Sequence, residues 1–250
     1  MDRYEPPTFD HVPDPDSALF LCAVDHRTGY SGSHTVGGEG PFDGSALLWA
    51  VALDAAAREP GLLTAAALRD IDAGGVAELF RIEGETVADP ERRAELLRDL
   101  ARGLERDHDG RARELLAAAN DSLGGDGGLL ALLARYDAYS DPLEKKSFLF
   151  AKICERRAWL AVRDPERWEV CADNVLMRLA LRSGLVDPGP LEDVRRATRA
   201  TFKEVAKLSC VPPPVLDDLL WELGRDDPDL VGTEAGDLSE PPRDPDSDWY

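Results

Sequence analysis

The stretch CADNVLMRLALRSG, residues 171–184, contains the pattern that decides the fold of this chain. An acidic residue, Asp173, precedes an apolar run with helical spacing, and Gly184 closes the run. Aspartate before a first turn accepts backbone N–H bonds, and glycine after a last turn ends many helices. The stretch therefore predicts a helix with Asp173 as its N-cap.

Similar starts and stops recur along the chain. Asp89 and Pro90 open a run whose leucines recur at helical spacing, with proline in the first position, where its missing N–H costs nothing. A long helix is predicted over 141–159, and a last one after the prolines at 212–214. Only a weak segment near 34–38 alternates like a strand. We therefore predict an all-α bundle of nine or ten helices.

Composition divides the chain into three parts. Residues 1–16 are rich in proline and acidic residues, and we expect them to form a flexible arm. Residues 226–250 are acidic with little apolar surface to bury, so we expect a disordered tail with a frayed end. Residues 17–225 are expected to form a single helical domain. The glycine-rich turn at 124–128 is the place where two lobes of that domain would divide.

The chain is strongly acidic, with a formal net charge of -20 from 49 acidic and 29 basic residues. Such a surface repels nucleic acid at ordinary salt. A lysine-poor, alanine-rich and acidic composition is also typical of proteins from a very salty cytoplasm, where charges are screened within about 3 Å at 1 M salt. We hypothesise a halophilic source, which leaves a nucleotide ligand open. Neither a signal pattern nor a membrane-spanning apolar run is present, so we expect a cytoplasmic monomer without membrane contact.

Several common catalytic motifs are absent from the sequence. The four cysteines form no CxxC pair, and three of them lie in apolar runs, which favours buried free thiols. There is no GxxxxGK[ST], GxGxxG, HExxH or GxSxG motif. These absences argue against phosphate-loop, dinucleotide and zinc chemistry. We therefore expect neither a metal nor a cofactor.

Three features are candidates for a site. By residue type alone, Asp173 is best explained as a cap, yet a cap aspartate that faces a cleft would have its pKa lowered by the helix end and stay ionised. Lys145 and Lys146 stand together at a predicted helix start, where they either pair with nearby acids or hold a phosphate. Asp217 and Trp221 share a helix face, either as a surface acid beside a core tryptophan or as a polar anchor beside a base-stacking ring.

The order of these features resembles the queuosine salvage family, the queuosine 5′-phosphate N-glycosylases/hydrolases, over about residues 17–225. CADNVLMRLALRSGLV resembles the segment with that family's catalytic aspartate, and Asp173 takes its position. YSDPLEKKSFLFAK resembles the lysine-bearing segment, and VLDDLLW matches a motif with Asp217 and Trp221 in place. The family is similar in fold to helix-hairpin-helix DNA glycosylases, so the resemblance implies that fold.

The resemblance implies hydrolysis of the N-glycosidic bond between a modified, 7-deazaguanine-type base and ribose. Asp173 would stabilise the oxocarbenium-like state and orient the water, and Lys145 would pair with a substrate phosphate or with Asp173. Asp217 would bind the base or sugar, and Trp221 or Trp49 would line the pocket. The remaining substrate-binding candidates are His26, which lies in a glycine-rich segment, Tyr139, Asp141 and Lys146.

Two alternatives stay open. In one, the chain is a helix-hairpin-helix DNA glycosylase/lyase acting on oxidised guanine, with the lysine attacking C1′ and the aspartate assisting. Arg195, Arg196, Arg199 and Lys203 would then follow a phosphate backbone, although a solvated helix face is the favoured interpretation of that series. In the other, the chain is a non-catalytic helical nucleotide-binding protein. Its support is that DNVLM stands where the family has DYRLP, so the Tyr-Arg pair is missing.

Overall fold

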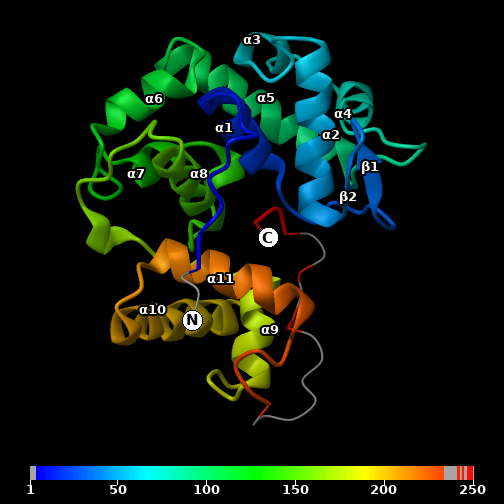
Figure 1. Cartoon of the computed structure of the whole chain (residues 1–250). Helices are drawn as coiled ribbons and strands as arrows, with labels where there is room; N and C mark the ends of the chain where they lie inside the picture. The colour runs from blue at the N-terminus through cyan, green and yellow to red at the C-terminus, as the bar shows by residue number, and fades with distance from the viewer. Residues whose placement is uncertain (1–3, 234–240, 243, 245–246, 250) are drawn as a thin grey trace.

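The regular structure of the described residues is mostly helical (Figure 1). The structure, a computed structural model, describes residues 4–233, 241–242, 244 and 247–249. Within these residues it forms eleven α-helices, two short 3₁₀ helices and one two-stranded hairpin. This confirms the predicted all-α class. No helix in the described part of the chain is long and apolar enough to span a membrane.

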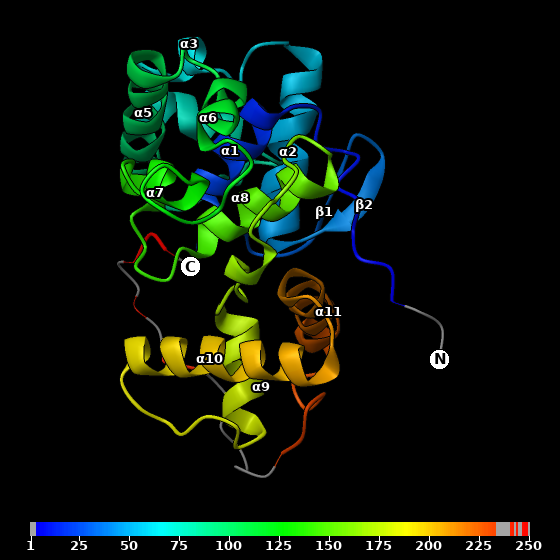
Figure 2. The ribbon, with the colours of Figure 1, turned by 90° about the vertical axis from the view of Figure 1, so that its left-hand side faces the viewer.

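The helices are arranged in two lobes, one above the other in Figures 1 and 2. The first lobe contains the following elements in chain order: α1 (Pro15–Val24), β1 (His34–Val36), β2 (Glu39–Phe42), α2 (Gly44–Arg58), α3 (Ala65–Leu68), α4 (Ala73–Leu79), α5 (Pro90–Asp107), α6 (Ala112–Ala119), α7 (Leu129–Leu133), η1 (Asp137–Tyr139) and α8 (Lys145–Arg156). η2 (Pro165–Arg167) connects to the second lobe, which consists of α9 (Asn174–Arg182), α10 (Leu191–Ser209) and α11 (Pro213–Asp226).

Each lobe has its own hydrophobic core. The first core includes residues from Val12 to Cys171, and the second includes residues from Val170 to Leu220. Leu123 and Leu129, on either side of the glycine-rich turn, both belong to the first core. The division between the lobes therefore lies near residue 170, and not at 124–128 as the glycines suggested. Glycine marks a tight turn, but only long-range packing decides where a core ends.

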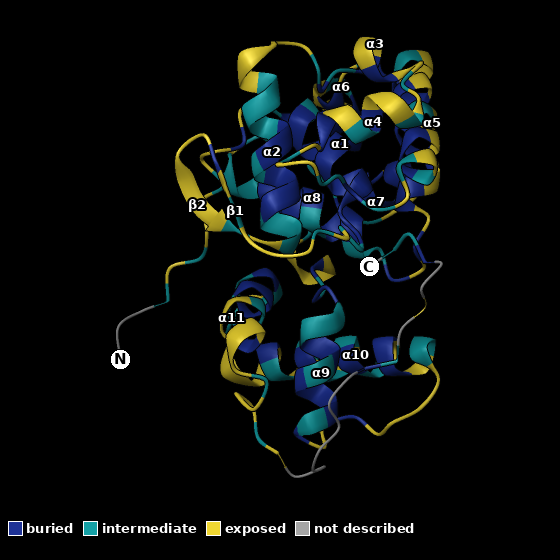
Figure 3. Cartoon of the chain, turned by 90° about the vertical axis from the view of Figure 1, so that its right-hand side faces the viewer, coloured by how far each residue is buried: buried dark blue, intermediate teal, exposed yellow. Residues whose placement is uncertain are grey.

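The first lobe is built around α1. Every residue from 17 to 24 is buried, as the dark blue of this helix in Figure 3 shows. A helix that is apolar on all sides is typical of the centre of a domain, where other elements cover each face. Here α8, α5, α6 and α2 pack around it. Central burial of α1 fixes the position of the residues that follow its last turn, Asp25 and His26.

The hairpin occupies the segment whose sequence alternated weakly. β1 and β2 pair antiparallel, with His34 opposite Phe42 and Val36 opposite Glu39. Val36 packs on α2 residues in a small hydrophobic cluster of its own. The hairpin therefore packs beside α2, and it is an element that the predicted all-α bundle did not include.

The opening stretch folds as predicted. Asp173 is the N-cap of α9, and its Oδ1 accepts hydrogen bonds from the backbone N–H groups of Val175 and Leu176, both at 3.0 Å. Gly184 follows the last turn with a φ of 71°, in the left-handed region that favours glycine. Both ends of α9 are therefore specified locally.

Helix α8 is shorter than the sequence predicted. Asp141 does not begin the helix but stabilises the turn before it, where its carboxylate accepts the N–H groups of Leu143 at 2.9 Å and Lys145 at 3.1 Å. Glu144 has a φ of 53°, so the helix begins only at Lys145. At the other end it stops at Arg156, and Ala158 is also left-handed, with a φ of 56°.

Buried ion pairs join the two lobes. Arg195 on α10 reaches Asp141 in the first lobe, with Nη2 at 2.7 Å from Oδ2, and both side chains are almost fully buried. Lys152 on α8 reaches two carboxylates of α11, Asp217 at 2.7 Å and Asp218 at 2.5 Å. Such pairs tolerate little displacement, because an ion left unpaired in a buried site is costly. They hold the lobes at a fixed separation.

The N-terminal arm also contributes to the interface between the two lobes. The described part of the arm is attached to both lobes: Tyr4 donates a hydrogen bond to Glu222 on α11, Arg156 donates to the carbonyl of Pro7, and Arg157 pairs with Asp10. Part of the expected disordered tail, 226–250, falls on residues outside the described ones. Of the rest, Ser247 and Asp248 contact the first lobe.

We predict that the Arg195–Asp141 pair contributes much of the stability of the lobe interface. Arg195→Ala leaves Asp141 buried without its counter-ion and should lower the free energy of unfolding by about 3–5 kcal/mol. Denaturant unfolding at fixed salt measures this. The matched control is Arg196→Ala on the next, exposed position, which should stay within about 0.5 kcal/mol of wild type. Equal stability of the two variants would contradict the prediction.

Candidate functional site

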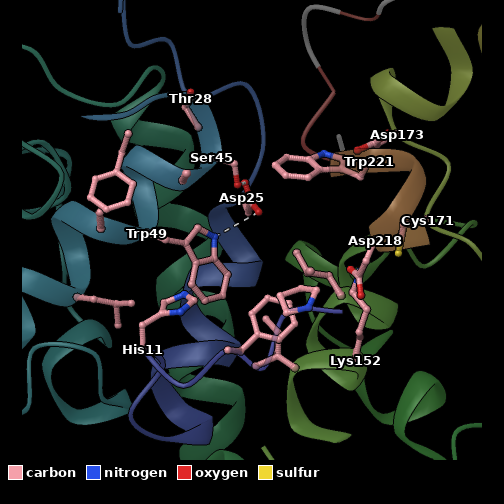
Figure 4. A pocket seen from close by; sticks show the side chains of 18 of the residues that line it. His11, Asp25, Thr28, Ser45, Trp49, Lys152, Cys171, Asp173, Asp218 and Trp221 are labelled. Atoms are coloured by element: carbon pink, nitrogen blue, oxygen red, sulfur yellow. Dashed lines mark hydrogen bonds and ion pairs between the residues drawn. The ribbon is translucent and has the colours of Figure 1, made fainter. Parts of the chain in front are cut away.

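A pocket of about 930 Å³ lies between the two lobes. The N-terminal arm, the segment after α1, the hairpin, α2 and α8 line it from the first lobe, and the start of α9 and the middle of α11 line it from the second (Figure 4). Its volume is at the upper end of the range for small-molecule sites, about 300–1,000 Å³. Pockets between lobes are a frequent place for ligands, so this is the candidate site.

Lys145 and Asp173 both line this pocket, as the sequence predicted for the catalytic pair. Lys145 stands in the first turn of α8, and its ammonium group lies 3.4 Å from the carbonyl oxygen of Asp25. Burial lowers the pKa of Lys145, but the negative charges of Asp25 and Asp173 outweigh burial, and the net pKa is raised. The amine is therefore protonated at neutral pH.

Asp173 has a pKa raised from 3.8 to about 6. Burial is the largest cause, and the charge of Lys145 and the two N–H bonds of the cap offset it only in part. We expected the helix end to lower this pKa, so the direction of that prediction was wrong. At pH 7 the carboxylate is still about nine-tenths ionised. Only Oδ1 accepts hydrogen bonds from the described residues, which leaves Oδ2 for a ligand or a water.

Asp25 is a site residue that the sequence analysis missed. It lies directly after α1, is 8% exposed, and accepts hydrogen bonds from Ser45 Oγ at 2.7 Å and Trp49 Nε1 at 3.3 Å (Figure 4). These two donors on α2 orient its carboxylate in the pocket wall. The sequence does contain a signal for Asp25. A central helix that is apolar on all sides is buried, so the acidic residue that directly follows it lies at the edge of the core. Lys145 is therefore influenced by the charges of two carboxylates from different lobes, Asp25 and Asp173.

Two tryptophans from different lobes also contribute to the wall. Trp49 comes from α2 and is 9% exposed, and Trp221 comes from α11. The guanidinium of Arg225 lies over the Trp221 ring, 5.3 Å from its centroid. Such a contact stabilises the orientation of the ring. Phe42 of the hairpin is a third aromatic residue in the lining.

Asp217 lines the pocket, but both of its carboxylate oxygens have partners within the protein. Oδ2 accepts from Lys152 at 2.7 Å, and Oδ1 accepts from the backbone N–H of Cys171 at 2.8 Å. Lys152 and Arg156 on α8 together neutralise Asp217 and Asp218. This cluster holds α11 and the segment before α9 against α8. The geometry therefore gives Asp217 a positioning role, in contrast to the substrate contact that the resemblance implies.

Three other candidates lie outside the pocket lining. Tyr139 donates its hydroxyl to the carbonyl of Leu19 at 2.6 Å, and Asp141 pairs with Arg195. Lys146 points the other way from Lys145: it is fully buried and donates to the carbonyl of Ala23 at 2.6 Å. The side chains of successive helical residues diverge by about 100°, so only one lysine of the pair can face the pocket. His26 lies at the edge of the pocket and contacts Lys146 through Nδ1 at 3.1 Å.

The basic series on α10 is largely occupied within the protein. Arg199 donates to the carbonyl of Leu143 and stacks over Phe148, and Lys203 pairs with Glu169. Together with buried Arg195, these side chains join α10 to the first lobe. The series therefore does not form the solvated face that we favoured. It also offers little to a phosphate backbone, because Arg196 is its one exposed arginine.

The described residues contain no group of three or more His, Cys, Asp or Glu side chains placed to hold a metal ion. Cys22, Cys154 and Cys171 are free and buried, as their apolar surroundings predicted. A scan against models of protein families found no match, and a search of curated proteins found no similar sequence.

We predict that Lys145 keeps the pKa of Asp173 from rising further. Lys145→Met removes an opposite charge and should raise the Asp173 pKa above about 6, by about one unit or more. Carboxyl-carbon NMR titration, with Asp173→Asn used to assign the resonance, measures the pKa. Lys146→Met is the matched control, because its ammonium points away from the pocket, and it should leave the value near that of wild type. An ordinary Asp173 pKa near 4 in all three proteins would refute this electrostatic coupling.

Proposed function

We propose that the protein hydrolyses the N-glycosidic bond of a nucleotide that carries a modified, 7-deazaguanine-type base. The observation that carries the proposal is that Asp173 and Lys145 line one aromatic pocket between the two lobes, where the charge of each shifts the pKa of the other. Cleavage of this bond passes through an oxocarbenium-like state. A carboxylate that is ionised and surrounded by protein stabilises such a cation more than it would in water.

The free oxygen of Asp173 supports a direct role in that chemistry. Its Oδ1 is held by the start of α9, which fixes the orientation of the carboxylate. Oδ2 accepts no hydrogen bond from the described residues, and the residue lines the pocket, so this oxygen is available to interact with the sugar or to accept a hydrogen bond from the attacking water. A general base works best when its pKa is near the working pH. The raised pKa of about 6 for Asp173 meets that condition.

The walls of the pocket suit a base and a ribose. Trp49 and Trp221 present aromatic surface from opposite lobes, and stacking on an aromatic ring stabilises a base by about 1–3 kcal/mol. Aromatic surface does not discriminate between bases. The choice of a 7-deazaguanine-type base therefore depends on the family resemblance of the sequence, and the assay must include other nucleotides.

The protonation of Lys145 argues for hydrolysis by water and against attack by lysine. A lysine that attacks C1′ must first lose its proton, and the two carboxylates near Lys145 raise its pKa. As an ammonium group it can instead hold Asp173 ionised or bind an anionic part of the ligand. With Arg195, Arg199 and Lys203 of α10 paired within the protein, no observation specifically favours the DNA glycosylase/lyase alternative.

The test is an assay of base release at high salt. The panel contains queuosine 5′-phosphate, related 7-deazaguanine nucleotides, guanosine 5′-phosphate and a duplex carrying 8-oxoguanine. We predict release from a mononucleotide, and a loss of about 10²–10³-fold in kcat for Asp173→Asn, which removes the charge that the transition state needs. The control is Asp187→Asn, the same change at an exposed position, which should retain activity.

Two results would overturn this proposal. Cleavage of the duplex alone, with a lysine adduct trapped by borohydride, would assign the site to DNA repair. Binding of a nucleotide without release of any base from the whole panel would instead support a non-catalytic nucleotide-binding protein.

A further inference from the structure

A group of basic side chains surrounds the described end of the chain. Arg92 on α5 places Nε 2.7 Å from Oδ2 of Asp248, and His26 places Nε2 3.7 Å from Oδ1 of the same carboxylate. Arg27 donates from Nε to the backbone carbonyl of Ser247 at 2.9 Å. We call His26, Arg27 and Arg92 the basic cluster. A carboxylate of the chain itself is therefore bound where α1 ends.

Further positive charge lies behind the basic cluster. Arg93 and Lys146 are both fully buried. Arg93 donates to the carbonyls of Ala88 and His26, and Lys146 donates to the carbonyl of Ala23. Carbonyl groups satisfy hydrogen bonds but do not neutralise charge. Burial, and then the charge of the neighbouring Lys145, lowers the pKa of Lys146 to about 7. Three carboxylates pair with the basic cluster: Asp89 with Arg27, and Glu95 and Asp248 with Arg92.

His26 has a buried donor without a hydrogen-bond partner. The side chain is 2% exposed, and burial together with nearby cations keeps its pKa well below the ordinary value, so the ring is neutral. Its Nδ1 lies 3.1 Å from Nζ of Lys146, and we assign Nδ1 as the acceptor of this hydrogen bond. The proton is then on Nε2, which has no hydrogen-bond partner and faces Asp248 from 3.7 Å. A buried donor of this kind needs a partner such as a water, an ion or a ligand group.

A carboxylate is too small to satisfy the whole basic cluster. One oxygen of Asp248 reaches Arg92 at hydrogen-bond distance, while the other stays beyond that distance from His26. A phosphate group has three terminal oxygens in a tetrahedral arrangement and can reach donors on several sides at once. His26 and Arg27 also line the large pocket, so an anion bound here lies at the edge of that pocket.

We propose that the basic cluster is a subsite for the phosphate group of the pocket's ligand, a phosphate monoester, and that Asp248 occupies this subsite in the absence of ligand. Asp248 then acts as an internal competitor. Because it is part of the same chain, its effective concentration at the cluster is on the order of millimolar. The phosphate must displace it, which weakens the apparent affinity of the ligand. The subsite requires no hydrolysis, so it is independent of the proposed reaction.

Calorimetric titration of the full chain with inorganic phosphate, at one fixed potassium chloride concentration, tests the subsite. Asp248→Asn removes the competing charge and should bind phosphate at least about tenfold more tightly than wild type, a difference of about 1.4 kcal/mol. Asp229→Asn is the matched control: it removes the same charge from the segment after α11, where Asp229 pairs with Arg182. It should bind phosphate as wild type does.

A second variant and a second probe complete the test. Adding Arg92→Gln to Asp248→Asn should abolish the gain, because the donor at 2.7 Å is lost. Ribose 5-phosphate should show the same gain as inorganic phosphate, since the subsite opens into the pocket. Equal phosphate affinity of wild type and Asp248→Asn overturns the proposal. Binding that survives Arg92→Gln, or a gain confined to inorganic phosphate, also overturns it.

This experiment separates the subsite from the proposed hydrolase. If phosphate binds more tightly to Asp248→Asn but no nucleotide releases its base, the hydrolase proposal fails and the subsite stands. If base is released and the affinity for phosphate does not depend on Asp248, the subsite proposal fails and the hydrolase proposal stands.

Discussion

The geometry of the site depends on buried ion pairs between two lobes that have separate hydrophobic cores. Arg195 with Asp141, and Lys152 with Asp217 and Asp218, connect α8 and the turn before it to α10 and α11. Apolar packing tolerates some sliding, but a buried ion pair loses most of its value when either partner shifts. These pairs therefore fix the distance across the pocket. Asp173 and Lys145 come from different lobes, so their juxtaposition is a consequence of the same contacts.

At the candidate site, competing electrostatic effects decide the charge of each group. Burial favours a neutral Asp173 and a neutral Lys145, whereas their mutual attraction favours two ions. For Lys145 the neighbouring carboxylates prevail, and for Asp173 burial prevails, with a pKa of about 6. Near neutral pH Lys145 is protonated and Asp173 is ionised, but the pKa of Asp173 is only about one unit below that pH. Such a carboxylate is well suited to interact with a developing positive charge.

The features that the sequence predicted correctly are those that depend on interactions within one or two helical turns. The cap at Asp173 and the helix that begins at Pro90 are where the sequence placed them, because capping and proline preference act over one turn. Long-range contacts decided the rest. The role of Asp217 depends on Lys152, 65 positions away in the chain, and Asp25 became part of the site through its donors on α2. No pattern within a single helix carries that information.

The central claim is that Asp173 stabilises positive charge on a ribose-like ring, whatever base the ligand carries. The most direct measurement is the affinity of a cationic ribose analogue, a ring with a protonated nitrogen, determined by calorimetry at pH 7.5. We predict that wild type binds this cation at least about tenfold more tightly than the neutral ring, and that Asp173→Asn removes the preference. Equal affinity for the cationic and neutral rings, or a preference that survives Asp173→Asn, would contradict the claim.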